Sequence, residues 1–208
     1  NRFRRFYLKK DVPNMRTVRT KVYNFEELSQ EAKQVAIERY RNNTTEVFLD
    51  MFQEDCIEAI QEAGFSGDIK LQYDLGYSQG DGLSFSCGYF TKLNEVFAEV
   101  LGEGKNKTID CIINNCSFVL KGNDGKYCFA SKGDLDFYFD NYQVNFTDSN
   151  IESVVEKVRE KLENIYVDLC KDLEKRGYAE IEWQNSDEYI EEEIKANEYE
   201  FTKEGNRF

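Results

Sequence analysis

Residues 149–176 read SNIESVVEKVREKLENIYVDLCKDLEKR, and this stretch decides the expected fold. Ser149 and Glu152 have the spacing of a capping box, and Gly177 stands where a helix would end. Apolar residues follow at alternating spacings of four and three: Ile151, Val155, Val158, Leu162, Ile165 and Leu169. The pattern predicts one long helix near 150–176. Because three heptads are too few to demand a coiled coil, we interpret its apolar seam as packing against a sheet.

Two β-hairpins are expected beside this helix. Residues 69–75 and 83–89 alternate apolar and polar side chains, and the glycine-containing string 78–82 connects them. A second turn signal, Gly-Asn-Asp-Gly at 122–125, separates apolar runs at 118–120 and 127–129. Hairpins interleaved with helices define an α+β class, with an antiparallel sheet packed against several helices.

The remaining elements follow from periodicity and capping residues. Helices are expected at 30–41, from Thr44 or Thr45 to Gly64, from Thr91 to Gly102, and at 187–197. Strands are expected at 15–22, 178–183 and 199–201.

Charge divides the chain into two predicted parts. Residues 1–21 hold eight Lys or Arg against one Asp, a net charge of +7 in a chain of net charge −13. We therefore predict a basic N-terminal arm at 1–21 and a single acidic α+β domain at 22–208. The acidic domain should repel nucleic acid and favour a basic partner.

Residue composition argues against an enzyme. The chain has no His, which removes Ser-His-Asp and Cys-His catalysis, and its six Cys form no CxxC pair. We predict free buried thiols, no catalytic residue, no metal site and no cofactor. No stretch reaches the ~20 apolar residues of a membrane span, so a cytoplasmic protein is expected.

Two strings are the candidate partner-binding residues. The first is an acidic cluster on the helix at 187–197, which resembles a row of phosphates in sign: Asp187, Glu188, Glu191, Glu192 and Glu193. The second is the turn 78–82, where Gln79 and Asp81 could read a partner by hydrogen bonds. The alternatives are a solvated acidic face and a tight structural turn.

A third group was weighed as a divalent-metal site. Asp134, Asp136 and Asp140 share one face of an expected strand, and Asn141 follows them. They lack the spacing of a calcium-binding loop, so we interpret them as a solvated sheet face.

Three strings resemble a family of small, largely uncharacterised phage and prophage proteins. They are FEELSQEAK at 25–33 continuing to AIERYR at 36–41, SQGDGLSF at 78–85, and ANEYEFT at 196–202. The resemblance implies a phage origin and action in the cytoplasm of a host cell. It supplies no catalytic residue.

These observations favour a non-enzymatic inhibitor of a host nucleic-acid-handling defence complex, of the anti-CRISPR or anti-restriction type. Its partner would be a host protein with a basic nucleic-acid-binding groove. Two alternatives stay open. One is a regulatory or assembly protein that forms homo-oligomers through the helix 150–176, and the other is a metal-dependent ligand-binding or enzymatic module.

Overall fold

The chain forms two compact units in the computed structural model. The described residues are 19–43, 49–102, 116–121, 128, 134–139 and 149–208. Unit 1 combines Asn1–Thr45 with Ser186–Phe208, and unit 2 is Glu46–Asn185. This division differs from the single domain predicted for 22–208, because the two ends of the chain pair with each other rather than with the middle.

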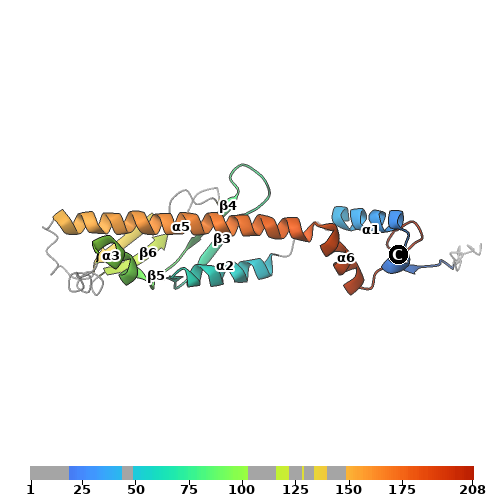
Figure 1. Ribbon diagram of the computed structural model, residues 1–208, viewed down its shortest axis with the longest axis horizontal. Helices are drawn as coiled ribbons and strands as arrows, with labels where there is room; N and C mark the ends of the chain where they lie inside the picture. Colours follow the sequence, from blue (N-terminus) through green and yellow to red (C-terminus); the bar gives the residue numbers. More distant parts are fainter. Residues whose placement is uncertain (1–18, 44–48, 103–115, 122–127, 129–133, 140–148) are drawn as a thin grey trace, which may run out of the picture. The chain divides into compact units, whose positions relative to one another are not determined.

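Unit 2 contains most of the regular structure. Its helices are α2 (Asp50–Glu62), α3 (Leu93–Leu101) and α5 (Ser149–Gln184). Its strands are β2 (Phe65–Ser66), β3 (Lys70–Asp74), β4 (Gly82–Ser86), β5 (Tyr89–Phe90), β6 (Cys116–Lys121) and β7 (Asp134–Phe139). They pair antiparallel as β2–β5, β3–β4 and β6–β7. α5 runs along the unit and packs against α2, α3 and β4 (Figure 1), which confirms the α+β class and the long helix.

The β3–β4 hairpin is confirmed, whereas the second hairpin pairs differently from the prediction. β3 and β4 align Leu71 with Phe85. β6 pairs with β7, and this register places Phe118 opposite Phe137. Cys128, the described residue of the predicted partner strand, lies outside any strand, and its backbone N–H donates to the Gly80 carbonyl at 3.2 Å. The turn residues 122–125 lie outside the described residues.

α5 continues past the residue that was expected to end it. The strand predicted at 178–183 is wrong, because these residues form the last turns of the helix. A Cβ at Gly177 would lie 2.5 Å from Leu75 Cδ1 and 2.8 Å from Phe52 Cζ. Gly177 is therefore a close-packing residue inside the helix and not a helix stop.

The buried face of α5 also differs from the predicted seam. The buried residues are Val158, Leu162, Tyr166, Cys170 and Leu173, whereas Ile165 and Leu169 are half-buried. Spacings of four, four, four and three keep close to the 3.6-residue period of a straight helix. At their centre, the Tyr166 ring lies 4.9 Å from that of Phe85, and its hydroxyl oxygen accepts the Phe85 N–H at 3.3 Å. The seam packs inside unit 2.

Unit 1 joins the two ends of the chain. It contains β1 (Tyr23–Asn24), a 3-10 turn (Phe25–Glu27), α1 (Gln30–Asn43), α6 (Asp187–Ala196) and β8 (Glu200–Phe201). β1 pairs antiparallel with β8, and the core consists mainly of Phe25, Ala36, Ile37, Ile190, Ile194 and Phe201. The helices predicted at 30–41 and 187–197 are confirmed. The strand predicted at 15–22 is absent at 19–22, and residues 1–18 of the basic arm lie outside the described residues.

Candidate functional site

Two of the five carboxylates in the predicted acidic cluster on α6 are paired with cations of their own unit. Ser186 caps this helix by accepting the Tyr189 N–H at 3.2 Å, which sets the direction of its first turn. Asp187 forms an ion pair with Arg41 of α1. Glu191 pairs with Lys195 at 3.4 Å, and Glu193 accepts a hydrogen bond from the Asn197 amide at 3.2 Å.

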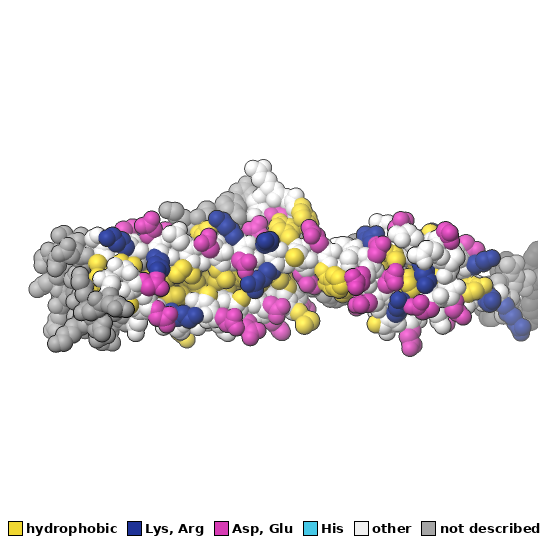
Figure 2. Space-filling view, viewed as in Figure 1, with side chains coloured by type: hydrophobic (Ala, Val, Ile, Leu, Met, Phe, Trp, Pro, Cys, Tyr) yellow, Lys and Arg dark blue, Asp and Glu magenta, His cyan; other side chains and the backbone are white. Residues whose placement is uncertain are grey.

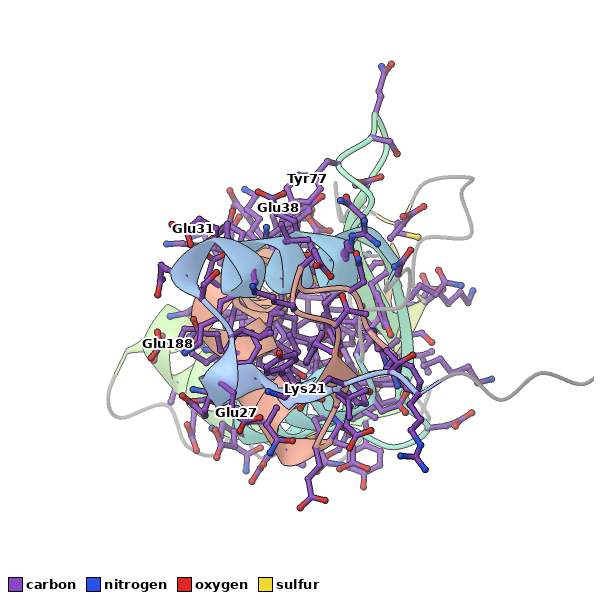
Figure 3. The ribbon with its side chains drawn as sticks, turned by 90° about the vertical axis from the view of Figure 1, so that its right-hand side faces the viewer. Lys21, Glu27, Glu31, Glu38, Tyr77 and Glu188 are labelled. Carbon is purple, nitrogen blue, oxygen red and sulfur yellow. The ribbon has the colours of Figure 1, made fainter. Side chains whose placement is uncertain are left out.

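Lys195 also ties α6 to the start of the unit. Its ammonium group lies 2.9 Å from a Glu26 carboxylate oxygen. This hydrogen bond lowers the pKa of Glu26 and raises that of Lys195. Two members of the predicted cluster, Glu188 and Glu192, are exposed and have no ion pair among the described residues. Figure 3 shows Glu188 on α6 and Glu38 on α1 projecting from the surface.

The turn at 78–82 is held by Asp81. Its carboxylate accepts the Ser78 backbone N–H at 2.7 Å, the Ser78 hydroxyl at 2.5 Å and the Tyr178 hydroxyl at 3.1 Å. These bonds, the Ser78 hydroxyl first, lower the pKa of Asp81. Partial burial and the Asp81 carboxylate raise the pKa of Tyr178 to about 12. Asp81 thus has a structural use within the hairpin.

The other residues of this turn are more accessible. Gly80 has φ of 104°, a conformation that favours glycine. Gln79 is exposed, and Tyr77, 65% exposed, places its ring 4.6 Å from that of Tyr178. The loop projects from the strands (Figures 1 and 3). Two residues of this turn were predicted to bind a partner. Asp81 is engaged within the turn, whereas Gln79 is exposed and makes no contact that holds the turn among the described residues.

The aspartates weighed as metal ligands do not converge where they are described. Asp136 lies 3.1 Å from the Lys121 ammonium group, and Asp134 is opposite Lys121 in the β6–β7 register. Asp140 and Asn141 lie outside the described residues. Among the residues that the structure does describe, no three acidic or Cys side chains gather as a metal site would require.

Sequence reasoning missed a second acidic helix, α2. It contains five acidic residues and no Lys or Arg: Asp50, Glu54, Asp55, Glu58 and Glu62. All five are exposed, and none forms an ion pair within the described part of the chain. Four of them recur every four residues, about 6 Å of helix rise, so they follow one side of the helix. The signal, one acidic residue in every four from Asp50 to Glu62, is visible in the sequence.

A groove runs between α2 and the last turns of α5. Its volume is about 510 Å³. Phe52, Cys56 and Ala59 form part of its lining from α2, and Leu173 contributes from α5. Burial raises the pKa of the Cys56 thiol to about 11, so Cys56 acts here as a small apolar side chain.

Charged residues surround this apolar lining. Asp55, Glu58 and Glu62 lie on the α2 side, whereas Arg176 and Glu180 lie on the α5 side. The Arg176 guanidinium is 2.6 Å from Asp172 of its own helix. Met51, also in the lining, is 78% exposed. Figure 2 shows hydrophobic side chains between α5 and α2, with acidic side chains gathered along α2.

The net negative charge of the chain resides in unit 2. Residues 46–185 hold 27 acidic and 13 basic residues, a net of −14. The residues of unit 1 number 13 acidic and 14 basic, a net of +1. A partner attracted by negative charge is therefore drawn to unit 2 rather than to α6.

Comparison with known protein families, curated protein sequences and solved structures finds no match to this chain. Within the described ranges, no helix combines the length and the apolar character needed to cross a membrane.

Proposed function

We propose that this protein is a non-enzymatic binding protein whose acidic α2 face occupies a cationic, nucleic-acid-binding surface of a partner. A phage-derived inhibitor of a host defence complex of the anti-CRISPR or anti-restriction type would act in this way. The observation that carries the proposal is the set of five exposed carboxylates on α2, none of which forms an ion pair with the described residues.

Electrostatics supports this choice of partner. A surface that binds nucleic acid is built from Lys and Arg that neutralise closely spaced phosphates. Carboxylates about 6 Å apart along one helix present the same sign to such a surface. Unit 2, at −14, adds a long-range field that raises the association rate with cations and repels nucleic acid itself.

The role of α5 as an oligomerisation helix receives less support. Its apolar side chains at Leu162, Tyr166 and Cys170 are buried within unit 2. An apolar seam that already packs in its own core is not available to a second copy.

Two matched variants test the proposal. Glu54→Gln/Glu58→Gln removes two exposed, unpaired carboxylates from α2, and Glu188→Gln/Glu192→Gln removes two at the same spacing from α6. The tagged full chain is used to capture proteins from nuclease-treated bacterial lysate, and captured proteins are eluted with duplex DNA. We expect the wild type and the α6 variant to release nucleic-acid-binding proteins, and the α2 variant to lose them. Equal capture by the α2 variant, or no release by DNA, would contradict the proposal.

A further inference from the structure

The groove between α2 and α5 combines an apolar surface with acidic margins. Phe52 and Leu173 lie beneath it in the core of unit 2, the exposed Met51 and the half-buried Ala59 supply its accessible apolar surface, and its margins are acidic. A solvated acidic face needs no apolar lining. Such a lining is typical of a surface that receives a side chain.

Its volume fits a side chain rather than a whole domain. About 510 Å³ lies within the range of small ligand sites and accommodates one or two large side chains. Met51 extends at its edge with 78% of its surface exposed, and a flexible thioether adapts to the shape of whatever binds.

Charge determines which segment fits. Four carboxylates and one guanidinium line the groove, and that guanidinium is hydrogen-bonded to Asp172 of its own helix. A nucleic acid or an acidic peptide would be repelled. A second copy of α2 would bring five more carboxylates against these. A cationic segment would form favourable electrostatic interactions with the acidic margins, and an apolar side chain within it would pack against the apolar surface of the groove.

We infer that this groove receives one Lys- or Arg-rich segment of a partner protein and buries an apolar side chain of that segment between α2 and α5. The inference rests on the proposed function and specifies the form of the partner. The flanking cations lie against Asp55, Glu58 and Glu62, so charge sets the approach and the apolar contact sets the residence time.

The test uses two fluorescein-labelled peptides of equal length and charge. In one, Leu residues are flanked by Lys, and in the other each Leu is replaced by Ser. Fluorescence anisotropy with the full chain at low salt measures both affinities. We expect the Leu peptide to bind about tenfold more tightly, because burying a Leu side chain is worth at least that factor.

Matched variants locate the apolar contact. Met51→Ser removes an exposed apolar side chain from the groove, and Phe208→Ser removes one that is 71% exposed in unit 1. Both leave the net charge unchanged. We expect Met51→Ser to reduce the preference for the Leu peptide to about threefold or less, and Phe208→Ser to retain it.

The other outcomes overturn the inference in distinguishable ways. Equal binding of the two peptides would overturn the apolar contact and leave the proposed function standing, since charge alone would then suffice. A preference that survives Met51→Ser would place the contact outside this groove. Failure of both peptides to bind at low salt would overturn the inference and the proposed function together.

Discussion

Helices α2 and α6 each carry five acidic residues, yet they present different surfaces. On α6, Arg41 pairs with Asp187 and Lys195 pairs with Glu191, and unit 1 as a whole has a net charge of +1. On α2, none of the five carboxylates has an ion pair among the described residues, although the Lys92 ammonium donates to the Glu62 backbone carbonyl at 2.6 Å. The number of acidic residues in a segment therefore does not locate the negative surface, because contacts in the folded protein determine which carboxylates are paired with a cation.

The contact that most changes α6 is distant in the chain. Arg41 and Asp187 are separated by 146 positions, so no local pattern connects them. The absence of ion pairs at the α2 carboxylates within the described residues likewise depends on the fold of unit 2.

The largest expected effect comes from disrupting the packing of α5 against α2 at Gly177. Replacing Gly177 by Leu forces a side chain into the space held by Phe52 and Leu75. Overpacking of this kind should lower the free energy of unfolding of unit 2 by about 3 kcal/mol, which outweighs the higher helix propensity of Leu. Chemical denaturation followed by circular dichroism measures the loss. Ala179→Leu, at an exposed position of the same helix, should change stability little. Equal stability of both variants would show that the packing at Gly177 is loose.

A smaller effect should make α6 resemble α2. Arg41→Gln/Lys195→Gln frees Asp187 and Glu191 from their ion pairs and leaves Glu26 with Lys33 as its remaining partner. At low salt, association with immobilised decalysine should become about threefold faster in surface plasmon resonance. Arg39→Gln/Lys203→Gln removes the same charge from exposed positions and controls for net charge alone. The same acceleration in both variants would contradict the pairing argument.

The smallest effect concerns a single carboxyl group on the α6 side. Because the Lys195 hydrogen bond lowers the pKa of Glu26, its contribution to stability is present above the unfolded pKa of about 4.3. That contribution is lost as the pH falls through the lower folded value. Carboxyl carbon chemical shifts should show Glu26 titrating below its ordinary range, and Lys195→Gln should move the titration upward. If Glu26 titrates in its ordinary range in the wild type, the hydrogen bond from Lys195 does not stabilise its carboxylate, and this prediction is wrong.

Local signals predicted most of the elements. The alternation at 69–75 and 83–89 gave the β3–β4 hairpin, and Gly64 follows α2 with φ of 108°, as a helix stop should. α6 also begins at the predicted residue 187, with Ser186 as its N-cap. Each of these depends on neighbours in the chain.

The errors concern features that depend on distant residues. Gly177 has the sequence signature of a helix end, but Phe52 and Leu75 give it another use. The partner of β6 is β7, which places Phe137 opposite Phe118, and no local pattern distinguished these residues from 127–129. Likewise, the acidic residues of α6 could be counted from the sequence, whereas the pairing of Asp187 with Arg41, 146 positions away, could not be predicted from it.

The pairing of β1 with β8 has a consequence for synthesis on the ribosome. β1 and α1 are synthesised before residues 46–185, whereas their partners β8 and α6 are synthesised after them, so unit 1 cannot complete its core until the whole sequence of unit 2 has been translated. Residues 19–43 must therefore remain without their β8 and α6 partners through the synthesis of 140 intervening residues.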